Sequence, residues 1–345
     1  MKTQHEDIRE YYGSVLKSKN DLKTGACCTS DSMPPHLRPL LADIHPEIQE
    51  RFYGCGSPIP YELKGLTVLD LGCGTGRDVF MLSRLVGAEG RVIGLDMTDE
   101  QLAVGRQYLG WQMQKYGYTN ANVDFRLGYM EDLAAAGIAD NSVDLVVSNC
   151  VMNLSPDKPR VFSEILRVLK PGGELYFSDV FADRRIPAGL QSDPVLLGEC
   201  LAGAMYTEDF RRLMLRCGVA DYRIVKSSPV PLLDAEIERK IGMIQFTSLT
   251  VRAFKLALED KCEDYGQVAY YLGTIPECPH EFLLDDHHLI KTGQPFLVCG
   301  NTAAMLAETR YAGHFRIAGD RTTHFGLFDC APAAVDGAVI PGACC

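Results

Sequence analysis

Short runs of apolar residues, each ending at a glycine or a polar residue, recur between residues 60 and 180. Such runs are typical of strands that are buried on both faces of a parallel sheet. They cover residues 66–71, 91–96, 123–127, 143–148 and 174–179. Apolar residues at helical spacing lie between them, in residues 77–86, 100–116 and 158–169. This alternation predicts a doubly wound α/β fold with a parallel sheet.

The pattern loosens after residue 180. Residues 196–217 have helical spacing, and residues 222–226 suit an edge strand that closes the sheet. From about residue 230 the chain changes to short strand-like pieces, such as residues 247–255 and 267–272, which predict a smaller α+β domain. We therefore expect a helical or irregular N-terminal segment (1–62), a cofactor-binding domain (63–228) with an insertion at about 181–220, a C-terminal α+β domain (229–330) and a small-residue tail that ends in cysteines (331–345).

Composition limits the possible classes of protein. Of the 345 residues 46% are apolar, which is enough to form the hydrophobic cores of two domains. The formal net charge of -11 argues against a nucleic-acid partner, because a phosphate backbone would repel it. The charged N-terminus does not resemble a secretory signal, and no apolar run approaches the ~20 residues that span a bilayer. We expect a cytoplasmic monomer without a membrane partner. In that compartment the 13 cysteines are thiols or ligands rather than a disulfide framework.

The clearest motif is the glycine-rich turn Asp70-Leu-Gly-Cys-Gly-Thr-Gly76, which follows the first strand and opens a helix. A side chain at Gly72 or Gly74 would block the approach of a ligand to the backbone. Such a turn alone suits NAD as well as S-adenosylmethionine. However, Asp70 can receive the ammonium group of an amino-acid-bearing ligand, and the following helix lacks the glycine spacing that seats a pyrophosphate. We therefore predict S-adenosylmethionine on a Rossmann-like methyltransferase sheet.

Residues at the ends of later strands complete the predicted cofactor site. Asp96 ends the second strand, where a carboxylate accepts both ribose hydroxyls, and Gln101 follows one helical turn later. Met130 and Glu131 suit an adenine face and its exocyclic amine. In the alternative interpretation Asp96 caps a helix and Met130 belongs to the core. The predicted cofactor-binding set is Asp70, Gly72, Gly74, Gly76, Asp96, Met97, Gln101, Met130, Glu131 and Asn149.

Three cysteines are expected at the edge where the cofactor binds. Cys150 follows the fourth strand, Cys200 lies in the segment after the fifth, and Cys55 lies upstream of the first. Each alone is more typical of a small buried hydrophobe. Together, however, they would compete for the sulfonium methyl group unless something occupied them. Thiolates without histidine or carboxylate partners favour soft ions, and structural zinc would need four ligands. Trivalent arsenic takes three sulfurs, and its lone pair can attack a methyl group without a general base.

The chain resembles the arsenite methyltransferases from about Tyr11 to Phe254. The most specific segments are Ser148-Asn-Cys-Val-Met-Asn-Leu154 and Gly198-Glu-Cys-Leu-Ala-Gly-Ala204. The resemblance implies that Cys55, Cys150 and Cys200 bind arsenic(III) as the substrate, with no metal cofactor. The arsenite, or its thiol adduct, would be converted to mono- and dimethylated arsenicals, with trimethylation left open. It also implies that Cys27 forms a disulfide with Cys55 during turnover, which thioredoxin or glutathione reduces.

Several interpretations stay open. Cys28 adjoins Cys27, so either residue could be the redox partner of Cys55. Cys27 is preferred because of its offset from Asp21-Leu22. The protein is alternatively a methyltransferase for a small organic acceptor, or a metalloid-binding protein without turnover. The terminal Cys344-Cys345 pair either captures arsenic or is an exposed tail, and Cys73 is expected to be a packing residue. His287 and His288, with Cys278 and Cys299, have irregular spacing that favours a solvated loop over a metal site.

Overall fold

The computed structural model describes residues 33–52, 54, 57–191, 193, 196–197, 200–232 and 234–330. The predictions for Cys27, Cys28, Cys55, Cys344 and Cys345 lie outside the described residues.

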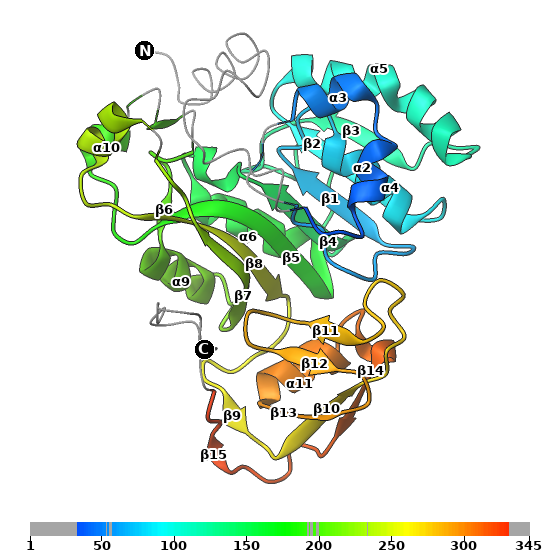
Figure 1. The fold of residues 1–345 in the computed structure, drawn as a ribbon, viewed down its shortest axis with the longest axis vertical. Coiled ribbons are helices and arrows are strands. Elements are labelled where there is room, and N and C mark those ends of the chain that lie inside the picture. Colours follow the sequence, from blue (N-terminus) through cyan, green and yellow to red (C-terminus); the bar gives the residue numbers. More distant parts are fainter. Residues whose placement is uncertain are drawn as a thin grey trace.

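A mixed sheet dominates the larger domain, with strand order β3-β2-β1-β4-β5-β8-β7 and β6 paired with β5 (Figure 1). The first five strands are parallel, and β8 runs antiparallel between β5 and β7. This arrangement confirms the predicted doubly wound α/β fold. The strands are β1 (Thr67–Leu71), β2 (Arg91–Asp96), β3 (Val123–Leu127), β4 (Val143–Asn149), β5 (Leu169–Ala182), β6 (Met205–Tyr206), β7 (Tyr222–Pro229) and β8 (Phe246–Phe254).

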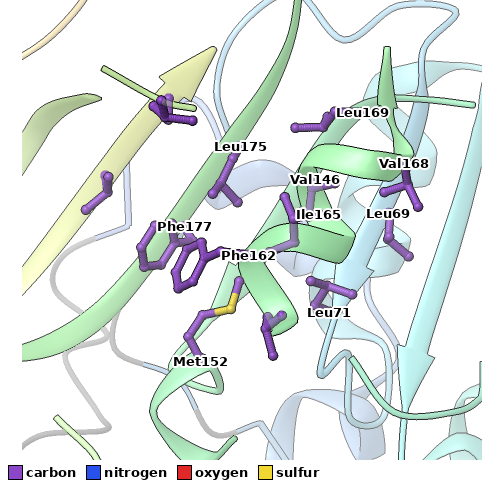
Figure 2. Packing of buried hydrophobic residues seen from close by; sticks show 14 of the residues in the cluster. Leu69, Leu71, Val146, Met152, Phe162, Ile165, Val168, Leu169, Leu175 and Phe177 are labelled. Carbon is purple, nitrogen blue, oxygen red and sulfur yellow. The ribbon is translucent and has the colours of Figure 1, made fainter. Parts of the chain in front are cut away.

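Helices cover both faces of this sheet because successive strand residues point to opposite sides. Leu69 of β1 packs in one core cluster with α6 and α9, and Val68 packs in another with α4 and α5. Figure 2 shows the first cluster, in which Phe162 and Ile165 of α6 meet strand residues such as Leu175. The helices are α2 (Arg38–Ala42), α3 (Pro46–Glu50), α4 (Arg77–Val86), α5 (Asp99–Tyr116), α6 (Lys158–Val168), α7 (Ala188–Gln191), α9 (Thr207–Arg216) and α10 (Ala235–Ile241), with a 3-10 turn η5 (Met152–Leu154).

Three predictions about secondary structure are wrong. Residues 196–217 do not form one helix, because Met205 and Tyr206 pair in parallel with Phe181 and Ala182 of β5 before α9 begins. The strand predicted at residues 247–255 does not belong to the small domain. As β8, it pairs with β5 along nine residues, so the main sheet extends past the expected boundary at residue 229. The fifth strand also starts earlier than expected, at Leu169, and includes the Lys170-Pro-Gly-Gly173 segment.

The smaller C-terminal domain packs beside the main sheet next to β5, β7 and β8 (Figure 1). Its three-stranded antiparallel sheet has the order β13-β10-β14, and its core includes Tyr271, Phe282 and Tyr311. The elements are β9 (Glu263–Asp264), β10 (Gln267–Tyr271), β11 (Glu281–Leu283), β12 (Leu289–Lys291), β13 (Pro295–Val298), α11 (Gly300–Ala307), η6 (Ala312–His314), β14 (Phe315–Ala318) and β15 (Gly326–Leu327). Among the described residues, no helix combines the length and the apolar character needed to cross a bilayer.

Candidate active site

The glycine turn between β1 and α4 has the backbone geometry that its sequence predicts. Gly72, Gly74 and Gly76 all have positive φ (70°, 53° and 94°), which favours glycine. A Cβ at Gly72 would lie 2.6 Å from the Val151 side chain, and one at Gly76 would lie 2.6 Å from the Phe125 ring. A Cβ at Gly74 would meet no atom within 4 Å. Packing therefore requires glycine at Gly72 and Gly76, whereas Gly74 faces space that is open to a ligand.

A cavity of about 100 Å³ lies against this turn, at the carboxyl ends of β1, β2 and β4. All of the predicted cofactor-binding residues line it except Gly76, which precedes α4. The lining residues from that set are Asp70, Gly72, Gly74, Asp96, Met97, Gln101, Met130, Glu131 and Asn149. Cys150 lines the same cavity. The fold thus brings residues from four separate stretches of sequence to one hollow.

The carboxylates of this cavity favour a cationic ligand. Burial raises the pKa of Asp70 well above its usual range, and the neighbouring charges of Asp78 and Asp96 raise it further. Burial also raises the pKa of Asp96, against hydrogen bonds that its carboxylate accepts from the amides of Gly74 and Thr98 (both 2.9 Å). A positively charged group beside Asp70 would lower the cost of ionising both carboxyls.

The structure brings Cys150 and Cys200 together at the edge of this cavity. The Cys200 thiol donates to the backbone carbonyl of Cys150 (3.1 Å), and the exposed fractions of the two residues are 1% and 4%. Cys150 is disulfide-bonded in the structure, so its sulfur would be available to a ligand only after reduction. Cys55, the third predicted ligand, lies outside the described residues. Its neighbour in sequence, Gly54, packs against Asn149, because a Cβ there would lie 2.8 Å from that amide.

Both cysteines have a left-handed backbone conformation, with φ of 58° at Cys150 and 61° at Cys200. Among the described residues, Glu62 and Asn141 are the other non-glycine positions with positive φ. This conformation is costly for a residue with a Cβ and concentrates at functional sites. The surrounding structure therefore holds both cysteines in a backbone conformation that a residue with a Cβ rarely adopts.

A buried polar network fixes the segment that carries Cys200. The Asn153 amide group donates to the Asp179 carboxylate (2.7 Å), to the carbonyl of Val180 (2.6 Å) and to the carbonyl of Cys200 (3.4 Å). Burial raises the pKa of Asp179 to about 7, and burial lowers the pKa of the nearby Lys158. The sequence analysis missed this network. The signal was an acid at the end of a buried strand, facing an asparagine three residues after Cys150.

Two weaker expectations can also be compared with the structure. Cys73 packs against Gly94, where a Cβ would lie 2.9 Å from its sulfur, and burial raises the pKa of its thiol well above the usual range. Both features fit a packing role. The expectation of a solvated loop at His287 and His288 is wrong, because His288 is buried and hydrogen-bonded through Nδ1 to Asp285 (2.7 Å).

Two protein-family models match the chain, one in the larger domain and one in the C-terminal domain. A family model described as a methyltransferase domain matches residues 62–218, and one described as an arsenite methyltransferase C-terminal domain matches residues 264–335. An arsenite methyltransferase of Aquipseudomonas alcaligenes is 54% identical over 94% of this chain and 94% of its own length. One of Homo sapiens is 42% identical over 90% of this chain and 83% of its own.

A solved structure resembles most of this chain. The crystal structure of an arsenic(III) S-adenosylmethionine methyltransferase from Chlamydomonas reinhardtii has a TM-score of 0.83 and 51% sequence identity. The match covers 86% of this chain and 99% of that one.

Proposed function

This chain belongs to the arsenite methyltransferase family, and from that premise we propose that Cys150 and Cys200 hold trivalent arsenic for methylation by S-adenosylmethionine. Cys55 would be the third sulfur ligand of arsenite. The observation that carries the proposal is the 3.1 Å contact between the Cys200 thiol and the Cys150 carbonyl, made beside a cavity that Cys150 itself lines.

The cavity residues suit S-adenosylmethionine. Asp70, whose pKa is raised by burial and by like charges, would receive the ammonium group, and Asp96 would accept hydrogen bonds from the ribose hydroxyls. Met130 and Glu131 would contact the adenine, and Gly74 leaves room for the ligand. When bound, the cofactor supplies a methyl group on a positively charged sulfur.

Methyl transfer then needs the chain to position the arsenic rather than to move a proton. The thiolates of Cys150 and Cys200 would point the lone pair of arsenic at the methyl carbon. With S-adenosylmethionine bound, an As–C bond would form from that lone pair while the bond from carbon to the sulfonium sulfur broke, and the departing sulfur would keep the bonding pair. No proton leaves the arsenic, so the site has no need of a general base. Asn153 would act as a positioning residue, because it holds the carbonyl of Cys200 against Asp179.

The arsenic loses two electrons, formally, in each transfer and must be reduced before the next. Cys27 and Cys55 would supply the two electrons by forming a disulfide, and an external thiol, thioredoxin or glutathione, would return them to thiols. Successive rounds would give mono- and dimethylated arsenicals, and trimethylation would need a third round. We also propose that the protein is a cytoplasmic monomer, with a separate N-terminal segment up to residue 62 that carries Cys27 and Cys55.

The test is to incubate the reduced protein with arsenite, methyl-labelled cofactor and glutathione, and then to separate the arsenicals. Label in mono- and dimethylated arsenic, formed only when arsenite is present, supports the proposal. Arsenite binding without formation of S-adenosylhomocysteine would instead indicate a metalloid-binding protein. Label transferred only to an organic acceptor, such as a quinone, would indicate an ordinary methyltransferase and overturn the proposal.

A further inference from the structure

A second cavity lies over β5, β8 and β7, between these strands, residues 57–61 and β11 of the C-terminal domain. Its volume is about 230 Å³. A single water molecule needs only ~10–15 Å³ of such space, so the second cavity can hold a small organic molecule. None of the described residues that line it also lines the cofactor cavity.

The lining of the second cavity favours an anion. Among the described residues that line it there is no aspartate or glutamate, whereas Lys226 and Arg252 bring positive charge. Lys226 is exposed, and no carboxylate of the described part of the chain forms an ion pair with it. Three hydroxyl groups, those of Ser228, Ser248 and Thr250, line the cavity on the same two strands, β7 and β8. An ammonium group beside hydroxyl donors suits a carboxylate.

Arg252 adds positive charge that is not fully neutralised. It is buried and pairs with the carboxylate of Glu174 (2.5 Å), which also pairs with Arg310 (2.5 Å). Two guanidinium groups therefore share one carboxylate. In a chain with a formal net charge of -11, this local excess of positive charge attracts an anionic ligand to the second cavity.

One row of residues across the sheet links the second cavity to the cofactor cavity. The row consists of register partners on β4, β5, β8 and β7, namely Asn149, Ser178, Thr250 and Lys226 (Figure 1). Asn149 lines the cofactor cavity, and Thr250 and Lys226 line the second one. Because adjacent strands lie ~4.8 Å apart, Thr250 is roughly 10 Å from Asn149, the residue before Cys150.

The chain before β1 contributes to both cavities as well. Phe52 lines the cofactor cavity, and Ser57 lines the second one. Between them in the sequence, a Cβ at Gly54 would lie 2.8 Å from the side-chain amide of Asn149. The two cavities are therefore neighbours on one face of the sheet.

On the basis of the function proposed above, we propose that the second cavity binds the reductant, a small thiol that carries carboxylate groups, and holds it near Cys150. Cys150 is disulfide-bonded in the structure and must be a thiol to bind arsenic. An extended tripeptide spans roughly 10 Å, the separation of Thr250 from Asn149. Two such thiols reduce one disulfide: their protons pass to the two sulfurs of the protein, and they leave joined by a new S–S bond.

The test of binding uses S-methylglutathione, which carries the carboxylates of glutathione but cannot reduce a disulfide. Calorimetry with the full-length, oxidised wild type should show binding. Lys226→Gln should weaken this binding roughly 10-fold, because a hydrogen bond to a charged group is lost. Lys261→Gln is the matched control and should bind like the wild type, since Lys261 is an exposed lysine that does not line the second cavity.

Turnover gives a second readout. In the methylation of arsenite, Lys226→Gln should raise the KM for glutathione by the same factor and leave kcat unchanged. The rate supported by thioredoxin should not change, because a protein reductant does not use the second cavity.

The proposal is overturned if S-methylglutathione does not bind at millimolar concentrations, or if Lys226→Gln binds it as tightly as Lys261→Gln does. A wild type that binds S-methylglutathione through Lys226 but does not methylate arsenite would support the binding site and contradict only the function proposed above.

Discussion

The thiol of Cys200 hydrogen-bonds to the carbonyl of Cys150, a residue fifty positions earlier in the chain. Cys150 directly follows β4, and its backbone amide donates to the carbonyl of Ser178 on β5 (2.8 Å). The segment that follows β5 therefore returns toward the carboxyl end of β4 and places Cys200 against Cys150, which lines the cavity. Both residues have positive φ, so the fold holds this contact between Cys150 and Cys200 despite the energetic cost of a left-handed backbone conformation.

The first prediction separates the roles of two glycines in the cofactor turn. Gly72→Ala should destabilise the protein markedly, because its Cβ would lie 2.6 Å from Val151 at a φ of 70°. Gly74→Ala meets no neighbouring atom, so it should cost only the left-handed penalty of about 1–2 kcal/mol. It should nevertheless weaken cofactor binding, since the new methyl group enters ligand space. Thermal melting and calorimetric titration with S-adenosylhomocysteine measure the two effects. An equal loss of stability in both variants would contradict this assignment.

The second prediction concerns Asp96. Asp96→Asn should weaken S-adenosylhomocysteine binding about 10–100-fold, because hydrogen bonds to a charged group contribute roughly 1.5–3 kcal/mol. Asp99→Asn is the control, since Asp99 begins α5 nearby but pairs with Arg106 (2.9 Å) and does not line the cavity. Calorimetry measures both affinities. Equal affinities in the two variants would show that Asp96 does not bind the ribose hydroxyls.

The third prediction is a pH dependence of stability that arises from Asp179. Burial raises its pKa to about 7 in the folded state, whereas an unfolded aspartate titrates near about 3.9. Between these values the folded protein keeps a proton that the unfolded chain has lost. This contribution to the free energy of unfolding is therefore complete below pH ~4 and is lost as the pH rises to about 7.

The asparagine in the Asp179→Asn variant does not titrate. As the pH rises from about 4 to about 7, the free energy of unfolding of this variant should therefore fall less steeply than that of the wild type. The two slopes should differ by up to about 1.4 kcal/mol per pH unit. Denaturant unfolding at a series of pH values between 4 and 8 measures the difference. Asp132→Asn, which replaces an exposed carboxylate, should keep the wild-type slope. Parallel curves for Asp179→Asn and the wild type would show that Asp179 is ionised throughout.

The fourth prediction distinguishes the two methylation rounds. A methylated arsenic has one fewer position for sulfur and needs two thiols, so Cys55→Ser and Cys27→Ser should slow the first round more than the second. Rates measured separately with arsenite and with a monomethylated arsenical give the comparison. Cys28→Ser is the control for its neighbour Cys27. If Cys28→Ser shows the asymmetry and Cys27→Ser does not, the choice between these adjacent residues was wrong.

Local pattern was enough to predict much of the fold. The bounds predicted for α4, β2 and β3 agree with the structure, because each is a short element whose apolar residues and flanking glycines mark its ends. The position of β8 could not be predicted in this way. Its place between β5 and β7 depends on pairing with a strand about seventy residues away, and its alternating polar residues suited a surface strand equally well.

Local pattern also predicted many of the residues that line the cavity of the candidate site. Strand ends and the glycine turn located the cavity-lining residues, since parallel strands present their carboxyl ends on one edge. The link from Asn153 to Asp179 and Cys200 depends on tertiary contacts between three separate segments. The left-handed conformation of Cys150 and Cys200 was equally hidden, because nothing in a cysteine residue signals positive φ.

The most direct measurement is the rate of arsenite methylation in Cys150→Ser and Cys200→Ser, beside Cys217→Ser. Cys217 is a half-buried thiol at the end of α9 that does not line the cavity, so its variant should keep the wild-type rate. Loss of either proposed ligand should lower the rate by at least about 10²-fold, because the reacting atoms would no longer be held in line. A folded Cys150→Ser or Cys200→Ser protein that methylates arsenite at nearly the rate of Cys217→Ser would contradict the proposed arsenic site.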